Sequence, residues 1–155
     1  MNQIIAEHWN KEKHELPGFN CIVYPNGVVT VLNCCSLPNS QAKECKYFCY
    51  PRCDTTIDNI EKYDASEWTL VDEWVRIEHE GKIFIGGDGT MGNFGFIAHI
   101  GSNDDLIWGI CFGDSNPIKE LAVNDNTLSA VNEHSEVYIS VNLSDLTEII
   151  WTDLR

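Results

Sequence analysis

Residues 94–151 read FGFIAHIGSNDDLIWGICFGDSNPIKELAVNDNTLSAVNEHSEVYISVNLSDLTEIIW, and this stretch decides the fold. Apolar, β-branched and aromatic runs alternate in it with turn-forming Gly, Asp, Asn, Ser and Pro. We expect strands at 96–100, 106–112, 118–123, 127–131, 137–141 and 146–151. Short strands separated by regular turns are typical of an antiparallel meander, as in a sandwich or a barrel. The sequence therefore predicts a mainly β fold.

Two hairpins are expected before this stretch. In the first, runs at 19–24 and 28–32 flank Pro25-Asn26-Gly27, where Asn-Gly tolerates the positive φ of a tight turn. In the second, the Trp-, Val- and Ile-rich run 68–78 is joined through Glu80-Gly81 to the run 82–85. Both hairpins fit the β architecture.

The remaining segments are less regular. A short N-terminal helix is expected within residues 1–16, ended by Pro17-Gly18. Residues 33–66 are irregular, with one helical turn near 41–49, and the five glycines of residues 86–95 predict a loop. The length suits one domain over 1–155.

The charge of the chain restricts the kinds of partner that it can bind. Its formal net charge is −14, and residues 120–153 contain seven acids and no Lys or Arg. Nucleic-acid binding requires clustered Lys and Arg to replace the counterions of the phosphates, so we expect no nucleic-acid partner. An acidic excess serves solubility or attraction to a positively charged partner.

The N-terminus indicates a cytoplasmic protein. It has neither the basic start nor the apolar core of a signal peptide, and no run reaches the length of a membrane span, so no membrane partner is expected. Seven cysteines without a secretion signal favour reduced thiols over a disulfide framework.

The spacing of the cysteines suggests a zinc site as one interpretation. Cys34, Cys35, Cys45, Cys49 and Cys53 lie close in sequence, and four converging thiolates bind zinc well. However, Pro51 interrupts the helix that would place the last three on one face. We therefore expect small, partly buried hydrophobic residues and no metal, with oxidation of neighbouring thiols as a third alternative.

No catalytic motif is present. The glycine-rich segment lacks the Lys and the spacing of phosphate-binding loops, the five histidines lack metal-binding spacing, and there is no G-x-S-x-G. We expect a protein that is not an enzyme and has no cofactor.

Residues 94–151 resemble small bacterial immunity proteins of polymorphic and contact-dependent toxin systems. The resemblance rests on a strand with the W-x-x-x-F spacing of Trp108 and Phe112, followed by Ser115-Asn-Pro117. It implies a non-enzymatic inhibitor that binds a cognate toxin domain, often a basic nuclease, in the cytoplasm.

An acidic surface suits such a partner, because it speeds encounter and occupies a phosphate site. The candidate contacts are acids in predicted loops: Asp104, Asp105, Asp114, Glu133 and Glu136. Trp108 and Trp151 lie in apolar runs and are expected in the core. The alternatives are a zinc-stabilised protein-binding module that uses the cysteines of 34–53, and a small hydrolase or ligand-binding β-barrel.

Overall fold

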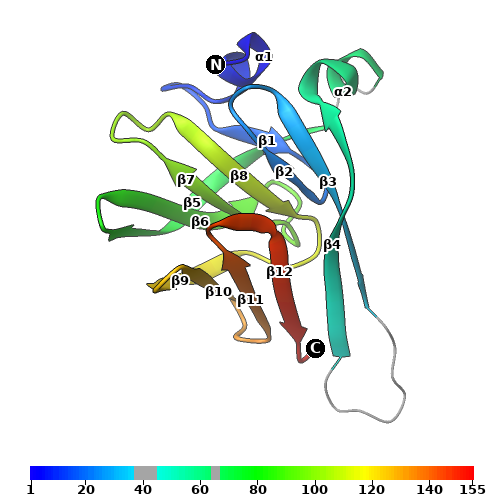
Figure 1. Cartoon of the computed structure of the whole chain (residues 1–155), viewed down its shortest axis with the longest axis vertical. Coiled ribbons are helices and arrows are strands. Elements are labelled where there is room, and N and C mark those ends of the chain that lie inside the picture. Colours follow the sequence, from blue (N-terminus) through cyan, green and yellow to red (C-terminus); the bar gives the residue numbers. More distant parts are fainter. Residues whose placement is uncertain (37–44, 64–66) are drawn as a thin grey trace.

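The computed structural model describes residues 1–36, 45–63 and 67–155, with only the backbone at 35–36 and 45–48. In this part of the chain, twelve antiparallel strands form one sheet that curls into a half-barrel (Figure 1). Two short helices, α1 (Gln3–His8) and α2 (Ile57–Tyr63), lie near one end. The mainly β prediction is confirmed.

The strand order is β1-β5-β6-β7-β8-β2-β3-β4-β12-β11-β10-β9. The N-terminal strands are β1 (Glu15–Pro17), β2 (Cys21–Val23), β3 (Val28–Ser36) and β4 (Cys45–Thr56). The central strands are β5 (Trp68–His79), β6 (Lys82–Gly89), β7 (Gly95–Ile100) and β8 (Leu106–Phe112). The C-terminal strands are β9 (Ile118–Asn124), β10 (Thr127–Asn132), β11 (Val137–Asn142) and β12 (Asp145–Asp153).

The expected strands of residues 94–151 are all present, but they do not form one continuous meander. Strand β8 pairs with β2, and β9 lies at the far edge of the sheet next to β10. Strand β2 pairs with the edge of β8 that would otherwise be free, so neighbours in the sheet are here distant in sequence. The chain therefore leaves β8 through residues 113–117 and continues as β9 at the far edge of the sheet. Three short meanders are therefore joined by non-sequential pairings.

The core has two parts, one on each face of the central strands. On the inner face, side chains such as Phe84, Ile97 and Ile110 pack against the C-terminal strands, where Trp108 and Trp151 are also buried, as expected. On the outer face, Phe96 and other side chains pack with residues of α1, β1 and α2. Strands β7 and β8 are apolar at almost every position because they are covered on both faces.

The short N-terminal helix is confirmed at residues 3–8, where Asn2 caps it, but it ends at His8, and Pro17 belongs to β1. Two other local predictions were wrong. Residues 45–49 belong to β4 and not to a helical turn, since they pair with β12, while residues 41–44 lie outside the described residues. Residues 86–89 of the expected glycine loop are strand, because β6 pairs with both β5 and β7 there.

Candidate functional site

A β-bulge in β5 shapes one surface of the protein. The register between β5 and β6 shifts between Glu73 and Val75, so Trp74 is an extra residue in β5. A β-bulge changes the direction in which a side chain points from the strand. Opposite it, a Cβ atom on Gly87 would collide with the backbone carbonyl oxygen of Asp72 and the backbone nitrogen of Trp74. Glycine at this position is therefore what permits the close approach of the two strands.

The indole of Trp74 lies at this surface. Its side chain is 47% exposed, and it is near enough to the carboxylate of Asp88 on β6 to favour the ionised form of that group. A large exposed aromatic ring loses little conformational freedom when it is covered by a partner.

Two carboxylates face each other beside this ring. Asp72 and Asp88 are direct cross-strand partners. Like charges in this position destabilise a sheet. Burial raises the pKa of Asp88, and the negative charges of Asp72 and Glu133 raise it further, while the nearby indole of Trp74 opposes the change. Among the residues that the structure describes, neither aspartate forms an ion pair with Lys, Arg or His.

We call Asp72, Trp74, Asp88 and Glu133 the bulge surface. It combines one exposed aromatic ring with three carboxylates from two separate parts of the sheet. Such a surface can bind a cationic group through the carboxylates while the ring is buried by the partner.

The side chain of Asn132 anchors the β10–β11 turn, which carries Glu133. The buried Asn132 amide donates to the carbonyl oxygen of Ser115 at 3.1 Å, and its oxygen accepts from the backbone nitrogens of Glu136 and Val137 at 2.8 and 3.1 Å. The backbone nitrogen of Glu133 also donates to the carbonyl of Pro117 at 2.8 Å. These bonds join the β8–β9 and β10–β11 turns into one rigid unit.

The five acids predicted from sequence fall into two groups. Asp114, Glu133 and Glu136 lie on these two joined turns, while Asp104 and Asp105 lie in the β7–β8 turn at the other end of β8. The seven residues of β8 separate the groups by about 20 Å. Sequence reasoning missed Asp72, Trp74 and Asp88, although the two consecutive acids Asp72-Glu73 interrupt the apolar alternation of that strand.

Asp104 makes contacts within the protein. Its backbone oxygen accepts a 2.8 Å hydrogen bond from the indole of Trp9, and its carboxylate lies 3.3 Å from the guanidinium of Arg76. Asp104 also adopts a φ of +62°, which closes the turn. These contacts attach the β7–β8 turn to the N-terminal segment and to β5.

An ion pair between the buried carboxylate of Asp153 and the guanidinium of Arg155 lies near Asp114, in the first group of acids. Burial alone would raise the pKa of Asp153, but hydrogen bonds from the side chain and backbone of Arg155 outweigh this effect and lower it. The shortest of these bonds is 2.7 Å, and the guanidinium also lies 3.8 Å from Asp114. This pair holds the end of β12 in place.

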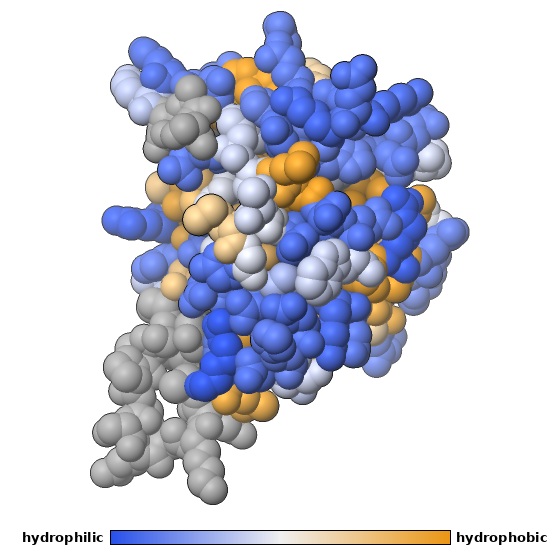
Figure 2. Space-filling model, turned by 180° about the vertical axis from the view of Figure 1, so that it is seen from behind, coloured by the Kyte–Doolittle hydropathy of each residue, from blue (hydrophilic) through white to orange (hydrophobic). Residues whose placement is uncertain are grey.

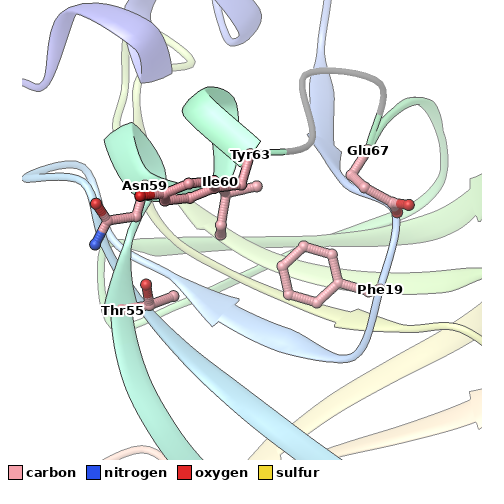
Figure 3. Close-up of a pocket in the computed structure, with 6 residues that line it drawn as sticks. All are labelled: Phe19, Thr55, Asn59, Ile60, Tyr63 and Glu67. Atoms are coloured by element: carbon pink, nitrogen blue, oxygen red, sulfur yellow. The ribbon is translucent and has the colours of Figure 1, made fainter.

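A shallow hollow of about 470 Å³ lies beside α2. Figure 3 shows its lining: Phe19 and Ile60 face one another, with Tyr63 beside them and Thr55, Asn59 and Glu67 at the rim. None of these described side chains is a histidine or a cysteine. The hollow therefore presents a mainly apolar surface.

The strand conformation of β4 separates the cysteines of the zinc alternative. A strand rises about 3.3 Å per residue, so the Cα atoms of Cys45, Cys49 and Cys53 are spaced about 13 Å apart. Thiolates that share one zinc ion each lie about 2.3 Å from it, which this spacing does not allow for those three. Among the described side chains, which exclude those of Cys35 and Cys45, no group of three or more metal-binding residues converges.

No protein-family model matches this chain, and no curated protein or solved structure matches it either. The helices of the described ranges are all too short to cross a membrane. Figure 2 shows one face of the molecule, where hydrophilic side chains predominate and divide the hydrophobic ones into separate patches.

Proposed function

We propose that this protein is a non-enzymatic immunity protein that binds and neutralises a basic toxin domain in the cytoplasm, with the bulge surface as its central contact. The observation that carries the proposal is the pair Asp72 and Asp88, two facing carboxylates beside the exposed ring of Trp74. Their mutual repulsion lowers stability in the protein alone and is relieved when a cation binds between them.

The net charge supports the same partner. A charge of −14 attracts a basic domain over a distance and raises the rate of association. Close to the surface, burial of Trp74 would supply affinity and the three carboxylates would select Lys or Arg side chains. In this scheme, the acids that normally repel one another become the determinants of specificity.

The rigidity of the site also favours binding. Glu133 is held in place by the turn anchored on Asn132. A preorganised surface loses less entropy on binding than a mobile one.

The test is a binding measurement with the C-terminal domain of the protein encoded immediately upstream. Trp74→Ala should weaken binding about 30-fold or more, the effect of losing an aromatic hot spot. Tyr50→Ala is the matched control, because Tyr50 is 46% exposed on β4, away from the bulge surface. Equal affinities of wild type and Trp74→Ala, or no binding by the wild type, would refute the proposal.

A further inference from the structure

Two pairs of cysteines face each other across neighbouring strands. Cys34 on β3 is the direct partner of Cys49 on β4, and Cys21 on β2 is the direct partner of Cys111 on β8. Facing residues in an antiparallel pair have Cα atoms about 4.5–5.5 Å apart, which lies within the range that a disulfide spans. The Sγ atoms of Cys34 and Cys49 are 2.6 Å apart, so joining them requires a movement of about half an ångström.

The two pairs differ in their access to solvent. Cys34 is partly exposed, and Cys49 beside it is 6% exposed, whereas Cys21 and Cys111 are both fully buried. Burial and the neighbouring Cys111 thiol raise the pKa of Cys21 well above its ordinary value. Since the thiolate is the reactive form, Cys21 is protected both by burial and by its raised pKa, and Cys111 is protected by burial.

We propose that Cys34 and Cys49 form a specific oxidation site, which a peroxide converts to an intramolecular disulfide in the folded protein while Cys21 and Cys111 stay reduced. The Cys34 thiolate attacks one oxygen of hydrogen peroxide, the O–O bond breaks, and the departing hydroxide takes up a proton to leave as water. The Cys49 thiolate then attacks the sulfenic sulfur of Cys34, an S–S bond replaces the S–O bond, and a second water leaves. The two sulfurs together lose two electrons, which reduce the peroxide.

The bond would link β3 covalently to β4. It would close a ring from residue 34 to residue 49 and so restrict the unfolded chain. We expect the melting temperature of the oxidised protein to exceed that of the reduced protein by about 5 °C. The site lies across the sheet from β5, so this inference stands apart from the proposed function.

The experiment treats the folded protein with one equivalent of hydrogen peroxide, blocks the remaining thiols and maps tryptic peptides without reduction. Cleavage after Lys13, Lys43, Lys46 and Arg52 gives peptides 14–43 and 47–52, which the proposed bond joins. A Cys35→Ser background removes the adjacent thiol from peptide 14–43. Cys34→Ser should abolish the linked peptide, whereas Cys53→Ser, which removes an exposed thiol of β4, should preserve it.

The expected result is linkage of 14–43 to 47–52, reversed by dithiothreitol and accompanied by the rise in melting temperature. The inference is overturned if no such linkage forms, if it persists in Cys34→Ser, or if peptide 14–43 is instead joined to 83–119, which contains Cys111.

Discussion

Replacing Asp72 by Asn should stabilise the protein, although it removes a charged side chain from its surface. Asp72 faces Asp88 across β5 and β6, and like charges in such positions cost about 0.2–1 kcal/mol. Asn has nearly the same shape as Asp, and Asp88 itself is unchanged. We therefore expect the free energy of unfolding to rise by about 0.5 kcal/mol at pH 7, and the melting temperature by about 1–2 °C.

The effect of Asp72→Asn on stability should depend on pH. The pKa of Asp88 is raised in the folded protein by burial and by the charge of Asp72, so the folded state binds its proton more tightly than the unfolded state does. The ionised carboxylate therefore lowers stability at neutral pH, and this cost disappears as the pH falls through the raised pKa. The advantage of Asp72→Asn should disappear over the same range.

Urea denaturation at pH 7 and pH 3 measures both quantities. Glu148→Gln is the matched control: it removes the same charge from an exposed residue of β12, so it reports the general effect of a lower net charge. A loss of stability in Asp72→Asn at pH 7, or a gain no larger than that of Glu148→Gln, would refute the reasoning.

Three further substitutions test the framework of the site by chemical denaturation. Arg155→Met leaves the buried carboxylate of Asp153 without its ion-pair partner and should lower the free energy of unfolding by about 3 kcal/mol at pH 7. Because the pKa of that carboxyl is lowered in the folded protein, the loss of stability should shrink as the pH falls below the ordinary pKa of 3.8. A loss that does not depend on pH would contradict this account. Gly87→Ala places a methyl group against the backbone of β5 and should cost about 1–3 kcal/mol, whereas Gly113→Ala, whose Cβ would meet only an ordinary contact at 3.5 Å, should cost clearly less. Asn132→Ala leaves two backbone nitrogens and one carbonyl without their partner and should cost about 2 kcal/mol or more; an unchanged urea midpoint would show that the joined turns do not depend on it.

The strands of residues 94–151 were predictable because each is bounded by a clear turn. Strand 106–112 was placed at its observed bounds, and the buried positions of Trp108 and Trp151 followed from the apolar runs that contain them. The order of the strands was not predictable in this way. Pairing of β8 with β2 depends on which free edge is available in space, and no local pattern records it.

The candidate site was missed for a related reason. Glycines usually indicate loops, yet Gly86 and Gly87 lie in a strand because side chains there would meet Ile118 and the backbone of β5. The loop predicted over residues 86–95 included Asp88, so its position opposite Asp72 was not predicted. Close approach between segments distant in sequence gives glycine a role that its local sequence does not reveal.

The most direct test of the acidic interface is the association rate constant for the upstream-encoded toxin domain, measured by stopped flow at low and at high salt. We predict nanomolar binding by the wild type, with association that slows steeply as salt rises because exposed charges are screened. Asp72→Asn should reduce both the rate and its salt dependence more than Glu148→Gln does. Association that is insensitive to salt, or equally affected by the two variants, would contradict the account.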